Sequence, residues 1–326
     1  MADGSTRVVY AALAGNALVA AAKYIAAALS GSSAMLTEAI HSTSDCTNQL
    51  LLLIGVRRGK LPADASHQFG YGMEIYFWTF AVAVLVLLAG GAYSIYRGVS
   101  ELAAPHQISS PKLSLAVLAV SAIFEGSSFR VGYRQYKKVV AAHRIPGQSI
   151  GLIQFIKLSK DPSLYESLLE DGAALAGLAV AAAGIVASAY FGLFRADGAA
   201  SVVIGMILVA NGIAILVATR SLVAGEAVAP PVLHDLRSAI EGHPWSDRVS
   251  DLETLHLGPS CILVAVTLLS GAGSDDQVGH EIERRLKATD PRILEVLFRL
   301  GVAGTHPPLG FKPKSAEAGE SEPPPG

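Results

Sequence analysis

A histidine and an aspartate stand one helical turn apart inside a stretch that is otherwise apolar enough to cross a bilayer. His41 and Asp45 lie in the segment Met35–Val56. Positions i and i+4 share one face of a helix, so we expect the imidazole and the carboxylate on the same side. A polar group at that depth costs about 2.5 to 3.5 kcal/mol unless it has a partner. The pair therefore predicts a bound cation or, alternatively, a buried hydrogen-bonded pair that holds no metal.

The ligand types narrow the chemistry of such a site. One imidazole nitrogen and one carboxylate suit Zn²⁺, and also Fe²⁺, Mn²⁺, Co²⁺ or Cd²⁺. A tetrahedral site needs two more ligands, and Glu170 and Asp171 lie at the start of a later apolar run. The alternative for both is a pair of helix-start carboxylates favoured by the helix macrodipole. About 22 residues follow Asp171 before that run ends near Phe194, which predicts Asp171 near the membrane boundary rather than level with Asp45.

Two further polar residues share the segment with His41. Glu38 lies three residues before it and could orient the second ring nitrogen, as metal-bound histidines usually require, or could be a simple polar residue at the helix end. Asn48 continues the stripe of His41 and Asp45, and we expect it to support a ligand or contact a neighbouring helix rather than bind the ion. Other isolated polar residues of the apolar runs are expected to pair between helices: Asn16, Lys23, Glu125 and Asn211.

The composition requires a membrane around these residues. Apolar residues make up 51% of the 326 positions and charged residues only 16%, against roughly 25% in a soluble chain. Six runs are long enough to cross about 30 Å of hydrocarbon. These predicted spans are Val8–Leu29, Met35–Val56, Ile75–Tyr96, Leu113–Phe129, Ala173–Phe194 and Ala199–Ala218.

The distribution of basic residues predicts the orientation of the spans. Eleven lysines and arginines flank the first span or lie after the second and fourth spans, whereas three lie in the remaining connections. The positive-inside rule then places both termini in the cytoplasm. The Ala-, Gly- and Arg-rich sequence without an organelle-type leader leads us to expect a bacterial inner membrane.

A change of composition after Gly225 predicts a second domain. Residues 226–304 alternate as helix (Pro231–Glu241), strand (Val249–His256), strand (Cys261–Leu269), helix (Asp275–Ala288) and strand (Ile293–Phe298). We therefore expect a membrane domain over residues 1–225 and a small α+β domain of order αββαβ over residues 226–304. Residues 305–326 are rich in Pro, Gly, Glu and Lys and predict a disordered tail.

Several function classes are disfavoured by the composition and by missing motifs. The formal charge of −2 argues against a nucleic-acid partner or a polybasic anchor. Two cysteines, Cys46 and Cys261, cannot form a disulfide scaffold. We expect no enzyme, because neither an HExxH motif nor a nucleophile elbow occurs. A membrane-embedded metallohydrolase, with Glu170 as its base, is the enzymatic alternative.

Five ordered motifs resemble the cation diffusion facilitators, a family of divalent metal exporters. They are GSSAMLTEAIHSTSDCTNQ (31–49), DASHQFGYG (64–72), DGAASVVIG (197–205), GEA (225–227) and LHLGP (255–259). The resemblance covers nearly the whole chain. The run LLEDGAA (168–174) is similar to the zinc-transporter branch of the family.

The resemblance implies a metal set and shows where this chain departs from it. It makes Asp171 the carboxylate that opposes His41 and Asp45. Many members carry a histidine four residues before that aspartate, where this chain has Ser167, so Glu170 or a water must replace the nitrogen or the coordination is incomplete.

The loop after the second span departs from the family in the same way. Family members often hold a second metal there with an aspartate and two histidines. Asp64 and His67 match that pattern, but Tyr71 stands in the place of the further histidine.

The resemblance also implies six spans, a ferredoxin-like cytoplasmic domain and a homodimer embedded in lipid. Metal binding needs a neutral imidazole and ionised carboxylates, so protons leave as the cation enters, and proton antiport by alternating access is the natural coupling. The metal is cargo, and no resident cofactor is expected. The alternative is a transport-inactive scaffold of the same fold, motivated by the missing histidine.

Overall fold

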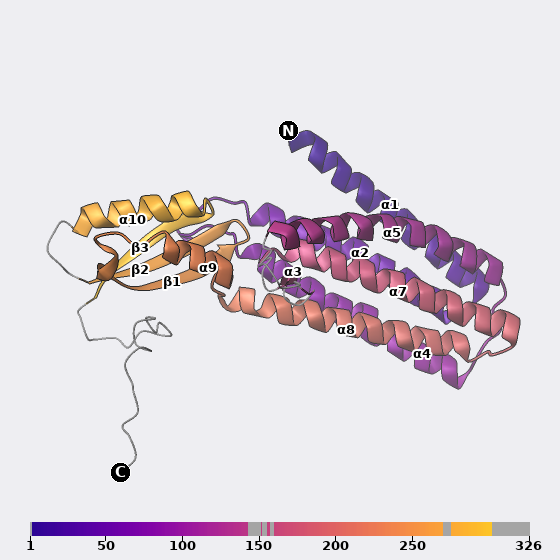
Figure 1. The fold of residues 1–326 in the computed structure, drawn as a ribbon. Coiled ribbons are helices and arrows are strands. Elements are labelled where there is room, and N and C mark those ends of the chain that lie inside the picture. The colour runs from indigo at the N-terminus through magenta and orange to yellow at the C-terminus, as the bar shows by residue number, and fades with distance from the viewer. Residues whose placement is uncertain (1, 143–150, 152–154, 157–159, 270–274, 302–326) are drawn as a thin grey trace, which may run out of the picture. The chain divides into compact units, whose positions relative to one another are not determined.

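The computed structural model describes residues 2–142, 151, 155–156, 160–269 and 275–301 (Figure 1). The chain divides into two compact units, Met1–Gly225 and Glu226–Gly326. The first unit is helical, and the second combines helices with a small sheet. The predicted disordered tail, residues 305–326, lies outside the described residues.

The described part of the first unit is a bundle of long helices (Figure 1). α1 packs against α2 and α5, α2 also packs against α7, and α8 packs against α4 and α7. The middle element is one continuous helix in which a π-helical segment, η1, separates α3 from α4. The bounds are α1 (Ala2–Ser30), α2 (Ser33–Arg58), α3 (Glu74–Leu85), η1 (Val86–Ala92), α4 (Tyr93–Ala103), α5 (Pro111–Ala142), α7 (Pro162–Phe191) and α8 (Ala196–Ala224).

Five stretches of the described helices are long and apolar enough to cross a membrane. They are Leu13–Ser30, Glu74–Ala103, Pro111–Ala141, Leu164–Phe191 and Ala196–Ala224. α2, with 26 residues, is also long enough, but its composition is too polar for it to count among the five. The chain is a multi-pass membrane protein, and its most polar long helix is the one that carries His41 and Asp45.

Two helices extend beyond the predicted spans, and one extension moves a candidate ligand. α5 continues past Phe129 to Ala142, so Arg130, Arg134, Lys137 and Lys138 lie on a helix rather than in a loop. α7 begins at Pro162 instead of Ala173, which places Asp171 inside the helix. The alternative that Asp171 is a carboxylate at the start of its helix is therefore contradicted. Apolarity underestimated α7 because its first turns carry glutamates and serines.

A tight turn connects α1 to α2 and fixes where α2 begins. Gly31 adopts a φ of 73°, a conformation that glycine reaches without steric cost. Ser32 follows as the N-cap, and its hydroxyl accepts the amide of Met35 at 3.1 Å. The turn sets the rotation of α2, and with it the direction of the histidine and aspartate further along.

Glycines allow α8 to pack directly against the backbone of the middle helix. A Cβ on Gly98 would lie 2.7 Å from the carbonyl oxygen of Gly198, and one on Gly205 would lie 2.9 Å from that of Gly91. Small residues at such crossings let membrane helices approach until their backbones touch. The α8 seam is therefore a close-packed scaffold.

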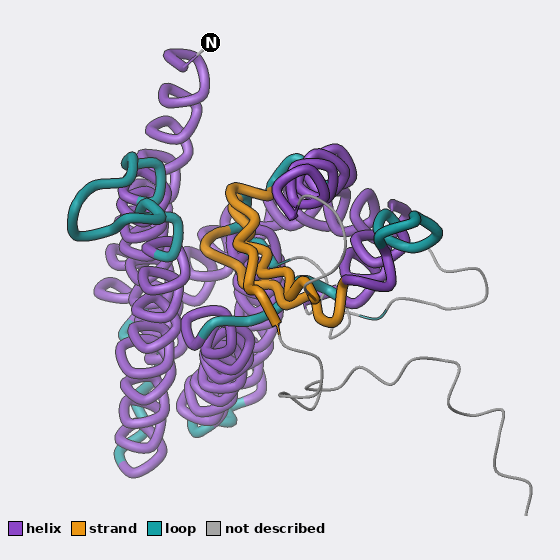
Figure 2. Tube along the Cα trace, turned by 90° about the vertical axis from the view of Figure 1, so that its left-hand side faces the viewer, coloured by secondary structure: helices purple, strands orange, loops and turns teal. Residues whose placement is uncertain are grey.

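The second unit has the predicted order αββαβ (Figure 1), and Figure 2 shows its strands in orange. Its three-stranded sheet has the order β1-β2-β3, with β1 antiparallel to β2 and β2 parallel to β3. The elements are α9 (Pro230–Ser238), β1 (Val249–Gly258), β2 (Cys261–Leu269), α10 (Asp275–Thr289) and β3 (Ile293–Gly301), with a short 3-10 helix at Ser246–Arg248.

One face of this sheet forms the core of the second unit. Alternate residues of β2, namely Val264, Val266 and Leu268, are buried against Leu236 of α9 and Ile282 of α10. Strand side chains alternate between faces, so the intervening residues of β2 turn away from these helices.

Candidate metal centre

The predicted pair on α2 is buried and close. Nδ1 of His41 lies 3.4 Å from Oδ1 of Asp45, and their side chains are 1% and 15% exposed. Neither ring nitrogen of His41 forms a hydrogen bond within the described part of the chain, and neither does Oδ1 of Asp45. Buried polar atoms without partners are uncommon, and each calls for a ligand, a water or a functional explanation.

A polar cavity of about 310 Å³ opens beside this pair. Four helices line it: α1, α2, α5 and α7. Its acidic residues come from three of them and will be called the cavity cluster, namely Asp45, Glu125, Glu170 and Asp171. Asn16, Gln49, Ser128 and Ser167 add neutral polar groups to the wall. The helix α7 thus brings Glu170 and Asp171 to the same cavity as Asp45, although the sequence had suggested a different depth.

The α7 carboxylates have partners on neighbouring helices. The amide of Asn48 donates to Glu170, and the hydroxyl of Ser128 donates to Asp171 at 2.7 Å. Ser167, the residue in the place of the family's histidine, also bonds Asp171. Asn48 therefore supports a candidate ligand across the α2–α7 contact.

The described side chains do not already form a coordination site. No group of three His, Cys, Asp or Glu residues in the part of the chain that the structure describes is arranged to hold one ion. His41 does not itself line the cavity. Binding of a cation by His41, Asp45, Glu170 and Asp171 would require their side chains to converge from the positions seen here.

Glu38 has a partner other than His41. Lys23 of α1 lies 3.2 Å from Oε2 of Glu38 and donates to the hydroxyl of Ser42 at 2.7 Å. Both charged side chains are fully buried. The expected interhelical pairing of Lys23 is present, and it takes up the carboxylate that could have oriented the imidazole.

Two glutamates of the membrane helices escaped assignment from the sequence. Glu125 lines the cavity, and Glu166 lies one turn before Glu170 with neither carboxylate oxygen hydrogen-bonded within the described residues. The signal for Glu166 was its i, i+4 spacing to Glu170, but the predicted fifth span began after both. Glu125 was singled out only as a polar residue in an apolar run.

Asp197 caps a helix other than its own. It lies in the first turn of α8, yet its carboxylate accepts the hydroxyl of Ser32 at 2.6 Å, the hydroxyl of Ser33 at 3.0 Å and backbone amides at the start of α2. Ser201 bonds Ser33 at 2.9 Å. We call Ser32, Ser33, Asp197 and Ser201 the cap cluster.

The loop carboxylate Asp64 is occupied by hydrogen bonds. Its Oδ1 accepts the amides of Ser66 and His67 at 2.8 Å, and its Oδ2 accepts the Tyr71 hydroxyl at 2.7 Å. These bonds, led by that of Tyr71, lower the pKa of Asp64 to about 2, and the same contact raises the pKa of Tyr71. The His67 ring stacks on Tyr71 with a centroid distance of 3.9 Å. Tyrosine thus takes up the carboxylate that a loop metal would need.

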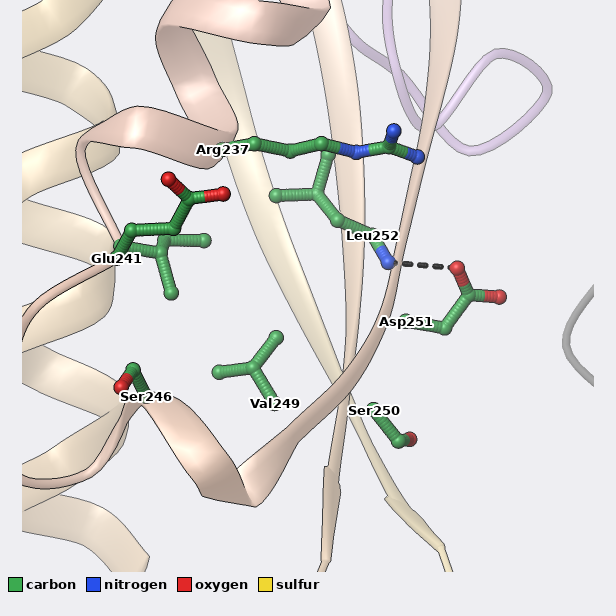
Figure 3. Close-up of a pocket in the computed structure, with 8 residues that line it drawn as sticks. Arg237, Glu241, Ser246, Val249, Ser250, Asp251 and Leu252 are labelled. Atoms are coloured by element: carbon green, nitrogen blue, oxygen red, sulfur yellow. Dashed lines mark hydrogen bonds between the residues drawn. The ribbon is translucent and has the colours of Figure 1, made fainter. Parts of the chain in front are cut away.

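A smaller cavity of about 90 Å³ lies within the second unit, between the residues that follow α9 and strand β1 (Figure 3). Arg237 and Glu241 extend along its wall, and Asp251 accepts the amide of Leu252 at 2.8 Å (Figure 3). Its lining contains neither histidine nor cysteine, so the candidate metal centre remains the cavity of the first unit.

A helical bundle with an acid-lined cavity between its membrane helices is consistent with the class of membrane transporters. The match to a family model is more specific: residues 9–222 match the cation efflux transmembrane domain. The chain therefore belongs to the cation efflux family, a family of transporters rather than enzymes, and the resemblance drawn from its motifs is confirmed.

Named relatives are similar over most of this chain. It is 28% identical over 255 residues to the mitochondrial proton-coupled zinc antiporter SLC30A9 of Homo sapiens, and 27% identical over 257 residues to that of Xenopus laevis. It is 29% identical over 255 residues to metal tolerance protein C4 of Arabidopsis thaliana. The alignments cover 78%, 79% and 78% of this chain but only 44%, 45% and 55% of those relatives. The chain thus spans about half the length of the proteins it matches.

Proposed function

We propose that the protein is a divalent metal cation efflux transporter that exchanges the metal for protons. The observation that carries the proposal is the acid-lined cavity beside His41, inside the helices that match the cation efflux domain. Carboxylates gathered at this depth in a membrane are unfavourable on their own, and a doubly positive ion would offset the cost. Zn²⁺ is the first candidate, because the matched relatives include proteins named as zinc antiporters.

The proposed ligands are His41 and Asp45 of α2 with Asp171 and Glu170 of α7. They contribute one nitrogen and several oxygens, which suits Zn²⁺ and leaves Fe²⁺, Mn²⁺ and Co²⁺ as acceptable cargo. Asn48 would hold Glu170 in place through the hydrogen bond between them. The helices would move between states open to one side and then the other, drawing the four side chains together around the ion.

Proton exchange follows from the protonation states that these ligands need. A metal displaces protons from imidazole and carboxylates, and its release lets protons return. An imposed pH gradient should therefore drive Zn²⁺ movement across proteoliposomes that contain the purified chain. A flux that ignores the gradient would contradict the exchange.

The ligand assignment has a direct test in the same assay. His41→Ala and Asp45→Ala should each lower Zn²⁺ flux at least about 100-fold, because even outer partners of metal ligands cost 10- to 100-fold when removed. Thr47→Ala is a matched control on α2, since the hydroxyl of Thr47 donates to the carbonyl of Thr43 at 3.0 Å and touches none of the proposed ligands. Normal flux in either ligand variant would refute the assignment.

A transport-inactive scaffold is the second candidate, favoured by Ser167 in the place of a nitrogen ligand and by the absence of a preformed coordination group among the described residues. Isothermal titration of the purified chain with Zn²⁺ separates the two. A scaffold would show no Zn²⁺ binding that depends on Asp45. A transporter would bind Zn²⁺ with measurable heat, and Asp45→Ala would abolish that heat.

Orientation, membrane and assembly complete the proposal. The bias of basic residues supports cytoplasmic termini, and composition supports a bacterial inner membrane. A homodimer is supported by the sheet face opposite the helices of the second unit, where the register pairs Leu255 with Leu263 and Ala265 with Leu297. A cross-linking experiment that yields only monomers would argue against the dimer.

A further inference from the structure

The cavity receives a carboxylate from a helix that the proposed ligand set does not use. Glu125 lies on α5 and lines the cavity together with Asp45 of α2 and Asp171 of α7. The sequence favoured interhelical pairing for Glu125. Within the described residues, however, no hydrogen bond or ion pair holds its side chain.

The charges around Glu125 do not supply a counterion of its own. Asp45 and Asp171 repel its carboxylate, and Lys23 attracts it. Lys23 is already paired with Glu38 at 3.2 Å. The acidic residues thus come together from three helices at a cavity whose described lining contains no lysine or arginine.

A second observation points to a ligand in the same place. His41 is 1% exposed, and both of its ring nitrogens are buried without a hydrogen bond in the described structure. Its Nδ1 lies 3.4 Å from Asp45, which forms part of the cavity wall. A buried imidazole with two unused nitrogens, next to a carboxylate oxygen of Asp45 that also has no hydrogen bond among the described residues, is an arrangement that a divalent cation would satisfy.

We propose that Glu125 is a metal-ligating side chain of the transport site, which supplies from α5 a donor where Ser167 of α7 offers no imidazole. This inference rests on the proposed function. It makes the site rich in oxygen, with one nitrogen and carboxylates from three helices. Carboxylate oxygens suit Mn²⁺ better than they suit softer ions, and imidazole suits Zn²⁺. Glu125 therefore broadens the cargo toward Mn²⁺.

The experiment measures Mn²⁺ and Zn²⁺ binding to the purified full chain by isothermal titration. Glu125→Gln keeps the shape of the side chain but removes its charge, and it should weaken Mn²⁺ binding at least about tenfold, and Zn²⁺ binding by a smaller factor. Glu125→Asp keeps the carboxylate on a shorter stem and should retain part of the Mn²⁺ affinity. Ser121→Ala is the matched control, because it lies one turn away on α5 and its hydroxyl bonds the Val117 carbonyl at 2.9 Å.

Thermal unfolding of the metal-free variants shows whether Glu125 is only structural. If Glu125 is a metal ligand, Glu125→Gln should leave the unfolding temperature of the metal-free chain unchanged or raise it, since the variant removes a repulsive charge. Unchanged affinities in Glu125→Gln, or an equal loss for both metals together with a lower unfolding temperature, would overturn the inference. If Asp45→Ala abolishes binding while Glu125→Gln does not alter it, the proposed function stands and only the role of Glu125 fails. If Asp45→Ala also binds normally, the proposed function fails first.

Discussion

Two polar clusters lie among the membrane helices, and they differ in how well their atoms are paired. In the cap cluster, the carboxylate of Asp197 receives hydroxyl and amide donors, and its side chain is 2% exposed. In the cavity cluster, Oδ1 of Asp45 is buried without a hydrogen bond in the described structure, and the neighbouring His41 uses neither ring nitrogen. The cap cluster joins α2 to α8, and the cavity cluster brings together α2, α5 and α7.

Under the proposed function, the difference separates a structural carboxylate, Asp197, from a carboxylate that would bind a ligand, Asp45. Hydrogen bonds to a charged group contribute about 1.5 to 3 kcal/mol each, and a buried group without them costs free energy. The cap cluster therefore stabilises the fold by itself. In the cavity cluster, Oδ1 of Asp45 lacks such a bond among the described residues, and in the proposed function a cation would supply the missing partner.

The buried pair of Lys23 and Glu38 lies between these extremes. Oε2 of Glu38 binds the ammonium, but its Oε1 is buried without a hydrogen bond among the described residues. A Cβ on Gly177 would lie 2.6 Å from that oxygen, so glycine is what allows α7 to approach the pair. Breaking such pairs is costly, since it leaves a charge buried alone. We read the pair as a structural contact next to the site.

The largest expected effect is a difference in folding stability between two alanine variants, one in each cluster. Asp197→Ala should lower the free energy of unfolding by about 3 kcal/mol, because the serine hydroxyls and the first amides of α2 lose their acceptor. Asp45→Ala should leave the unfolding free energy unchanged or raise it, because it removes a carboxylate with an unpaired oxygen. Unfolding of the two variants in detergent, followed by circular dichroism, measures both.

Zn²⁺ binding by the same two variants provides the control for the stability measurement. The folded fraction of Asp197→Ala should bind Zn²⁺ with wild-type affinity, whereas Asp45→Ala should not bind it. Equal losses of stability in the two variants would show that the pairing of atoms does not distinguish the clusters.

A smaller expected effect is a gain in Zn²⁺ affinity when an imidazole nitrogen is added to the cavity wall. Ser167→His places an imidazole on the cavity wall one turn before Asp171, so Zn²⁺ should bind about tenfold more tightly, equivalent to 1.4 kcal/mol. Titration with Zn²⁺ measures the gain, and Ser167→Asn controls for added bulk without a metal ligand of that type. A gain in the asparagine variant alone would contradict the interpretation.

Most of the fold followed from apolar runs and turn residues. The order of the second unit was predicted correctly because Gly258 and Pro259 mark the hairpin, and strand and helix periods differ clearly there. The bounds of α5 and α7 were wrong where polar residues continue a helix, since apolarity detects a membrane span and not the end of a helix. The π segment at Val86–Ala92 had no signal that we identified.

The site was only partly predictable, because residues that meet across two helices are not separated by any regular spacing in the sequence. His41 and Asp45 share one helix, so their spacing located them. The partners of Asp197 are separated from it by 163 to 165 positions, and only the packing of α2 on α8 brings them together. Glu125 reaches the cavity in the same way, through contacts that α5 makes with α1 and α7.

The smallest expected effect extends the comparison to the loop, where Asp64 is paired as fully as Asp197. Because the folded-state pKa of Asp64 is lowered to about 2, its hydrogen bonds stabilise the loop above the ordinary aspartate pKa of about 3.9, and this contribution is lost as pH falls through about 2. Tyr71→Phe removes the leading cause, so the pKa should rise and the loss should begin at a higher pH. The carboxyl carbon shift of Asp64, followed by NMR as the pH falls, measures the change. Tyr76→Phe, which removes a hydroxyl bonded to the Lys160 carbonyl instead, is the control. An unchanged pKa in Tyr71→Phe would mean that the backbone amides of Ser66 and His67 alone hold the carboxylate ionised. Tyr71, which stands in the place of the family's further histidine, would then not stabilise the loop.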